Sequence, residues 1–231
     1  MKAFSTPAIM EASVSPHVSH AMLNDGIVEA RAYQLEAVDE ALSSSMLLVM
    51  PTAAGKTAVI WMMISEKLSR GGRVMMIAPT VGLVEQHIRS LREVLKLKDG
   101  IVQITGQLPP AKRVEKWDGA RLVVATPKVV VNDVSNGVVD LSDFSVLVVD
   151  EAHHCTGDHA MAQVCDNYIS KNVRPHILGV TASPGHRPEA VREICKRTGA
   201  VRIHIRNSAE EMLSGYLSEL EVREITVSVP D

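Results

Sequence analysis

The 231 residues of the chain are enough for one large domain or two small ones, and 46% of them are hydrophobic and 22% charged. This composition excludes a disordered or fibrous protein. The net charge of −3 argues against a protein that binds nucleic acid through a general excess of positive charge, although it is compatible with one that holds a few phosphates through main-chain amides.

The cysteines and the apolar runs indicate the environment of the protein. The three cysteines form no paired framework, so a reduced, intracellular and cytoplasmic protein is expected. No apolar run reaches the roughly 18 residues of a membrane span, and the N-terminus lacks the pattern of a signal peptide. We therefore expect no membrane partner.

The elements follow in chain order. Residues 1–24 show no clear periodicity and are expected to form a loosely ordered lead-in, followed by one domain over residues 25–231. Apolar spacing predicts an amphipathic helix from Ile27 to Leu42. Apolar runs that end at Pro, Gly or polar residues predict strands at residues 46–49, 74–78, 101–105, 122–125, 146–149, 176–180 and 201–206. Helices are predicted at residues 58–69, 81–97, 127–134, 158–170 and 189–197, with a short polar helix after Pro109 and an extended segment at 222–229.

This repeated alternation of strands and helices predicts an α/β domain with a mostly parallel sheet and helices on both faces. The Val- and Ile-rich runs suit strands that are buried on both faces. Ligands of such open sheets bind at the carboxyl ends of the strands. Small hydroxyl and acidic residues follow nearly every predicted strand, so the functional site is expected at that edge.

Residues 50–57, Met-Pro-Thr-Ala-Ala-Gly-Lys-Thr, lie between the first predicted strand and the next helix. This is the context of a phosphate-binding loop, in which backbone N–H groups and the helix dipole attract a polyphosphate. Gly55 would let the backbone approach the ligand, Lys56 would reach its phosphates and Thr57 could ligate Mg²⁺. Met50 stands where the strict pattern has glycine, and Gly-Lys-Thr also occurs in ordinary turns.

Two adjacent carboxylates, Asp150 and Glu151, follow the apolar run at residues 146–149. One acid at this place can hold Mg²⁺, and the next can polarise the water that attacks a γ-phosphate. Such a pair is often merely solvated when it stands alone. The phosphate-binding loop earlier in the chain favours the functional interpretation.

Potential zinc ligands are dense near this pair. However, their spacing fits no standard zinc pattern, so no structural zinc is expected. The residues concerned are His153, His154, Cys155, His159 and Cys165.

Taken together, the motifs resemble those of DEAH-type superfamily 2 helicases. Residues 51–57 resemble motif I, residues 149–153 motif II and residues 180–185 motif III. Motifs Ia, Ic and Ib are matched by residues 78–80 with Gln86 and His87, by residues 105–106 and by residues 125–127. The details look most like the branch of archaeal Hef and Fanconi-anaemia M-type helicases, with RIG-I-like and Dicer helicases nearby.

The resemblance implies a RecA-like P-loop NTPase domain that uses ATP and Mg²⁺. ATP contacts are implied for Arg31 and Gln34 of a Q-motif and for Thr52, Ala53, Ala54, Gly55, Lys56, Thr57 and Asp150. Mg²⁺ would be held by Thr57 and Asp150, and the catalytic residues would be Lys56, Asp150 and Glu151. Contacts with the backbone of one nucleic-acid strand are implied for Thr80, Gln86, Thr105, Gly106 and Thr126. Coupling between the two ligands is implied for His153, Thr181 and Ser183.

The sequence departs from the family pattern at two places. Ala53 replaces the usual motif I glycine, an exchange expected to tighten the loop and weaken nucleotide binding. Nothing after Gly185 resembles motifs IV to VI, so a second RecA-like domain with its arginine finger is expected elsewhere in a longer chain or in a partner. The isolated chain is therefore expected to hydrolyse ATP very slowly and to unwind nothing.

The substrate expected from the resemblance is nucleic acid, with DNA favoured over RNA. Action on branched or forked DNA during repair fits the Hef-like motifs. The alternatives are an RNA-sensing ATPase, a double-strand translocase and a nucleotide-gated binding module without a catalytic role.

Overall fold

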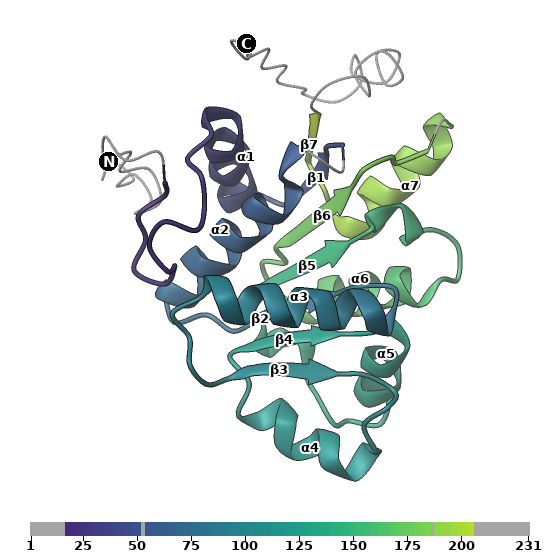
Figure 1. Ribbon diagram of the computed structural model, residues 1–231. Coiled ribbons are helices and arrows are strands. Elements are labelled where there is room, and N and C mark those ends of the chain that lie inside the picture. Colours follow the sequence, from purple (N-terminus) through teal and green to yellow (C-terminus); the bar gives the residue numbers. More distant parts are fainter. Residues whose placement is uncertain (1–16, 52–53, 186, 206–231) are drawn as a thin grey trace.

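The computed structural model describes residues 17–51, 54–185 and 187–205 (Figure 1). Within these residues seven strands form one sheet in the order β3-β4-β2-β5-β6-β1-β7, and the six pairings are parallel. The strands are β1 (Met46–Val49), β2 (Val74–Ile77), β3 (Ile101–Ile104), β4 (Leu122–Ala125), β5 (Val146–Asp150), β6 (Ile177–Thr181) and β7 (Arg202–Ile205).

Helices cover both faces of the sheet. They are α1 (Ala32–Ser43), α2 (Lys56–Ser69), α3 (Val81–Val94), α4 (Pro110–Asp118), α5 (Pro127–Ser135), α6 (Ala160–Lys171) and α7 (Pro188–Thr198). One core cluster joins the sheet to α1, α2 and α3, and a second joins its other face to α4, α5, α6 and α7. Figure 1 shows α2 and α3 in front of the sheet. The predicted α/β architecture is therefore confirmed.

The central strands are apolar because they are buried on both faces. Every residue of β1, β2, β4, β5 and β6 is buried, and successive side chains enter opposite core clusters. Leu48, for example, packs in the first cluster and Leu47 in the second. This alternation explains why the sequence shows continuous apolar runs.

The first helix begins later than the sequence predicts. The spacing indicates a helix from Ile27, whereas α1 begins at Ala32. The residues between them form a bend and an isolated bridge: Glu29 pairs in antiparallel fashion with His17, and the Val18 N–H donates to the Val28 carbonyl at 2.7 Å. Tertiary pairing has overridden the helical periodicity of this short segment.

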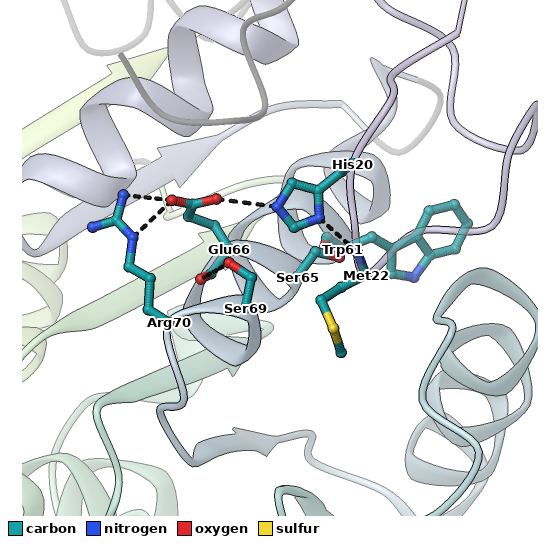
Figure 2. Close-up of polar contacts among 7 residues, drawn as sticks. All are labelled: His20, Met22, Trp61, Ser65, Glu66, Ser69 and Arg70. Atoms are coloured by element: carbon teal, nitrogen blue, oxygen red, sulfur yellow. Dashed lines mark hydrogen bonds and ion pairs between the residues drawn. The ribbon is translucent and has the colours of Figure 1, made fainter. Parts of the chain in front are cut away.

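Part of the predicted lead-in is also packed, as residues 17–24 contribute to the core. Val18 and Leu23 are buried, and Leu23 forms a bridge with Leu95. His20 is buried as well and donates from Nε2 to the Glu66 carboxylate on α2 (Figure 2). The expectation of a loosely ordered lead-in is therefore wrong for residues 17–24, while residues 1–16 and the predicted extended segment at 222–229 lie outside the described residues.

In the described part of the chain, no helix has the length and apolar character needed to cross a membrane.

Candidate functional site

The sheet order divides the polar strand ends into two adjacent groups. The loops after β1 and β5 carry residues expected to bind a nucleotide, and the end of β6 carries two of the expected coupling residues. The loops after β2, β3 and β4 carry residues expected to contact nucleic acid. Each group occupies neighbouring strands in the order β3-β4-β2-β5-β6-β1-β7. Figure 1 shows the arrowheads of β3, β4, β5 and β6 at one edge of the sheet. The two groups meet between β2 and β5.

Gly55 makes the turn from the loop after β1 into α2. It is the N-cap of α2 with φ +80°, a left-handed conformation that favours glycine. A Cβ atom at this position would lie 2.1 Å from Nε2 of Gln34. The backbone conformation therefore favours glycine, and a larger residue would also displace the side-chain amide of Gln34.

The first turn of α1 holds this loop from the side. The Tyr33 hydroxyl donates to the Ala54 carbonyl at 3.1 Å, and Gln34 Nε2 lies 3.4 Å from the same oxygen. Arg31 donates to the Glu29 carboxylate at 2.6 and 2.9 Å and to the Tyr33 hydroxyl at 3.2 Å. Arg31 and Gln34, the residues of the expected Q-motif, thus lie beside the loop that is expected to hold the phosphates.

Gln34 retains an unused acceptor. The residue is 2% exposed, and its buried Oε1 has no hydrogen-bond partner among the described residues. A buried amide oxygen without a partner costs about 1–3 kcal/mol. A ligand that donates a hydrogen bond to this oxygen would remove that cost. The amino group of an adenine base is a donor of this kind.

Asp150 and Glu151 are held by the end of β5. Asp150 is 8% exposed; its Oδ2 accepts from His87 Nε2 at 2.7 Å and its Oδ1 accepts from the Glu151 N–H at 3.0 Å. Glu151 has φ +55°, and it is the non-glycine residue with positive φ in the described ranges. Such a conformation costs about 1–2 kcal/mol and turns the Glu151 side chain away from the line of the strand.

A chain of polar contacts connects this pair with β6. His153 Nδ1 lies 3.2 Å from Glu151 Oε2 and 3.0 Å from Thr181 Oγ1. The Thr181 hydroxyl in turn donates to the Ser183 carbonyl and accepts from the Ser183 N–H. The three residues predicted to couple the ligands are therefore brought together, in contact with the acidic pair.

Lys56 lies in the electrostatic field of the acidic pair. Burial lowers the pKa of its ammonium group, and the carboxylates of Glu151 and Asp150 oppose this decrease. β1, which leads into the loop before Lys56, and β5, which ends at Asp150, are both neighbours of β6, so the cation and the acidic pair lie at the same edge of the sheet. Among the described residues there is no group of three or more His, Cys, Asp or Glu side chains that could hold a metal ion.

The donor set fits Mg²⁺ bound together with a polyphosphate. Mg²⁺ takes oxygen ligands, usually one or two from the protein, and completes its shell with water and substrate phosphates. Asp150 at the end of β5 and Thr57 in the first turn of α2 can supply two such oxygens.

The residues expected to contact nucleic acid differ in exposure. Gln86 and Gly106 are exposed and Thr126 is half-buried. Thr80 is exposed but caps α3, where its hydroxyl accepts from the Leu83 N–H at 3.2 Å. Thr105 follows β3 directly and is 2% exposed, and the next residue, Gly106, is exposed. The contact of Thr105 with a bound strand stays a prediction.

Thr52 and Ala53, which were expected in the nucleotide site, lie outside the described residues. Met50, which replaces a motif glycine, is fully buried in the first core cluster. Its position under the loop explains why an apolar residue is accommodated there.

Two residues of the site had no predicted role. The sequence motifs assign no place to Tyr33, and they include His87 only as part of motif Ia. The sequence does contain a signal for His87, because it is a polar residue among the apolar positions Val84, Ile88 and Leu91 of one helix face. That pattern indicates a buried polar residue but does not show its partner.

The parallel sheet, the loop before α2 and the acidic pair after β5 define a RecA-like P-loop nucleotide-binding domain. A family model described as DEAD/DEAH box helicase matches residues 31–191. That match covers more than half of the sequence, and the chain belongs to the DEAD/DEAH box helicase family.

The relatives confirm the resemblance to the Hef and Fanconi-anaemia M-type branch. The crystal structure of the Pyrococcus furiosus Hef helicase domain has a TM-score of 0.77 and 34% identity, covering 81% of this chain and 40% of that one. The Methanocaldococcus jannaschii protein named "Putative ATP-dependent RNA helicase MJ1505" is 36% identical over 93% of this chain and 27% of its own length. The Drosophila melanogaster "DEAD-box ATP-dependent DNA helicase Fancm" is 32% identical over 87% of this chain and 14% of its own. The chain thus spans a minor part of each relative.

Proposed function

We propose that the chain is the ATP-binding domain of an ATP-dependent helicase or translocase that acts on DNA, with branched or forked DNA in repair as the expected substrate. The observation that carries the proposal is the gathering of Lys56, Asp150 and Glu151 at the carboxyl edge of the sheet. The name of the Drosophila Fancm relative, which is called a DNA helicase, supports DNA as the substrate. The Asp-Glu-Ala-His sequence at residues 150–153 supports the DEAH type.

In this proposal Lys56 stabilises phosphate charge, and Arg31 and Gln34 read the adenine. Thr57 and Asp150 hold Mg²⁺, which when bound neutralises charge on the β- and γ-phosphate oxygens. Glu151 orients or deprotonates the attacking water. The role of Glu151 fits its side chain, which the positive φ turns out of β5 and which His153 holds at 3.2 Å.

The second partner is a nucleic-acid strand over the ends of β2, β3 and β4. Thr80, Gln86, Gly106 and Thr126 would contact its sugar–phosphate backbone through hydroxyls, amides and helix N-termini. Such contacts position a strand without reading its bases. His153, Thr181 and Ser183 would pass the nucleotide state to this surface. The cytoplasmic location expected from the three unpaired cysteines stays a prediction.

A second RecA-like domain in the same longer chain completes the proposal. It is supported by the small share of each relative that this chain covers. An arginine finger from such a domain raises the rate of ATP turnover by roughly 10³–10⁵-fold. We therefore expect residues 1–231 alone to turn over ATP very slowly.

The test is ATP turnover by the full-length protein with single-stranded DNA, forked DNA and duplex RNA, with Glu151→Gln and Lys56→Ala as controls. Stimulation by forked DNA that both variants lose is the expected result. Stimulation by RNA alone would assign the protein to the RNA-dependent class, which the name of the Methanocaldococcus relative favours. Unchanged turnover in Lys56→Ala would refute the nucleotide site.

A further inference from the structure

We propose that His87 is a positioning residue that fixes the Asp150 carboxylate for the magnesium nucleotide and connects it with α3, the helix that carries Gln86. This inference rests on the proposed function and extends it by a residue without an assigned role. His87 would act through Asp150 and would not touch the nucleotide.

The contact is short, buried and directed. His87 Nε2 donates to Asp150 Oδ2 at 2.7 Å, and the two residues are 7% and 8% exposed. The other carboxylate oxygen accepts from the Glu151 N–H at 3.0 Å. Both oxygens of Asp150 therefore have a donor, and rotation of the carboxylate would break at least one of these bonds.

The fold explains why these two residues meet. β2 and β5 are neighbours in the sheet, with Ile77 paired to Val149, so Asp150 lies at the edge where the chain leaves β2 towards α3. His87 in the second turn of α3 consequently reaches the end of β5. His87 lies on the buried face of α3 between Val84 and Ile88, which holds its ring towards the sheet.

The same helix carries the residues proposed to contact nucleic acid. Thr80 caps α3, and Gln86 precedes His87 and is exposed. A strand held by Gln86 and by the start of the helix would act on the position of α3. A shift of α3 would move Asp150, the proposed Mg²⁺ ligand, through the His87–Asp150 hydrogen bond. This bond joins the nucleic-acid group of strand ends to the nucleotide group.

The chemistry favours this role over simple packing. Ligating carboxylates are commonly held by hydrogen bonds from a second layer, and loss of such a partner typically costs about 10–100-fold in metal affinity or activity. A leucine at position 87 would fill a comparable volume without the cost of burying an imidazole. The imidazole has its partner in Asp150, so its burial is explained by this contact.

A second buried histidine–carboxylate contact provides a matched control. His20 Nε2 donates to Glu66 Oε2 at 3.1 Å, and the other Glu66 oxygen accepts from Arg70 (Figure 2). His20 Nδ1 accepts from the Met22 N–H at 3.1 Å. Glu66 follows Lys56 by ten positions, about 15 Å along α2 at 1.5 Å per residue. This cluster attaches residues 17–24 to α2 and lies away from the nucleotide site.

The experiment compares His87→Leu, His87→Gln and His20→Leu in the full-length protein. Mg²⁺ is titrated against the fluorescence of bound N-methylanthraniloyl-ADP, a readout that requires no turnover. We expect His87→Leu to raise the half-saturating Mg²⁺ concentration about tenfold. His87→Gln, whose amide nitrogen reaches a similar place to Nε2, should stay within about threefold of wild type. His20→Leu should lower the melting temperature without changing the Mg²⁺ dependence.

A second readout tests the connection to α3. ATP turnover is measured with and without forked DNA, and the ratio of the two rates is compared between variants. His87→Leu should lower this ratio more than the unstimulated rate, and His87→Gln should restore it. An unchanged Mg²⁺ dependence in a folded His87→Leu protein would overturn the proposal.

If His87→Leu fails to fold, His87→Asn replaces it, because its shorter amide falls short of Asp150. Equal Mg²⁺ dependence of the Asn and Gln variants would then refute the positioning role. If the wild-type protein itself shows no Mg²⁺-dependent nucleotide binding, the proposed function fails first and this inference falls with it. If the wild-type protein binds the nucleotide in a Mg²⁺-dependent way and His87→Leu has the same Mg²⁺ dependence, this inference is refuted and the proposed function stands.

Discussion

The hydroxyl of Tyr33 donates a hydrogen bond to the carbonyl oxygen of Ala54 at 3.1 Å and thereby joins the first turn of α1 to the phosphate-binding loop. The same hydroxyl accepts from Arg31 at 3.2 Å. One phenol thus connects the proposed adenine-reading residue with the proposed phosphate site. This relationship leads to the first prediction.

Tyr33→Phe should weaken ATP binding about fivefold, because the loop loses a hydrogen bond of about 1 kcal/mol. Fluorescence titration with N-methylanthraniloyl-ATP measures the change. Tyr168→Phe is the matched control, since its hydroxyl donates to the Phe144 carbonyl at 3.0 Å in the second core cluster. Equal nucleotide affinity in the two variants would contradict the proposed role of Tyr33.

Gly55→Ala should abolish measurable nucleotide binding and destabilise the domain. The new Cβ atom would lie 2.1 Å from Gln34 Nε2 in a residue that also has φ +80°. Gly71→Ala separates the two causes, because Gly71 has φ +79° with nothing within 4 Å of the added Cβ atom. That control should cost about 1–2 kcal/mol of stability from backbone strain and leave nucleotide binding intact.

Comparable loss of nucleotide binding in Gly55→Ala and Gly71→Ala would show that the close approach of Gln34 is unimportant. Urea denaturation followed by circular dichroism gives the stabilities, and the same fluorescence titration gives the affinities.

Thr181→Val should uncouple ATP turnover from strand separation in the full-length protein. The substitution keeps the shape of the side chain but removes the hydroxyl that contacts His153 at 3.0 Å and bonds to Ser183. We expect turnover within a few-fold of wild type and a loss of about tenfold or more in strand displacement, measured with a fluorescently labelled fork.

Thr198→Val is the control for that substitution, because the Thr198 hydroxyl is buried and donates to the Ile194 carbonyl within α7. A parallel decrease of turnover and displacement in Thr181→Val would identify a general structural effect instead of coupling.

The pH dependence of stability should have a contribution from His176. Burial and the neighbouring Lys67 lower the pKa of His176 to about 4, from the ordinary value of 6.5. The imidazole Nε2 donates to the Ala41 carbonyl at 2.6 Å, and Nδ1 accepts from the Lys67 ammonium at 3.0 Å. The folded protein therefore holds His176 neutral in a place where a cation is unfavourable.

Because the unfolded chain binds the proton more readily between pH 4 and 6.5, stability should rise with pH across this window. The free energy of unfolding should fall by about 3 kcal/mol on acidification from pH 7 to pH 4 from His176 alone. Thermal melting of wild type and His176→Gln between pH 4 and 7 measures it. The variant should show a shallower slope, and an identical slope in both proteins would contradict the assignment.

The order of elements and the nature of the site could be predicted from the sequence because both are local properties. Short apolar runs that end at Pro, Gly or Thr mark strands such as Val74–Ile77 wherever they lie in the sheet. The Gly-Lys-Thr and Asp-Glu motifs follow such runs closely, so the sequence alone assigns Lys56 and Asp150 to strand ends. The predicted start of α1 was wrong, because residues before Ala32 pair with another segment in the Glu29–His17 bridge. Such pairing is not visible in the periodicity of the helix itself.

Only the tertiary structure decided which strand ends are neighbours. The order β3-β4-β2-β5-β6-β1-β7 places β2 beside β5, although β3 and β4 separate them in the chain, and this brings His87 to Asp150. Tertiary packing also buries Thr105 and brings His20 to Glu66 on α2. Periodicity reports which face of an element is buried, since burial depends on the spacing of apolar side chains along one element. The partner across that face is chosen by long-range pairing and packing, which no single segment encodes.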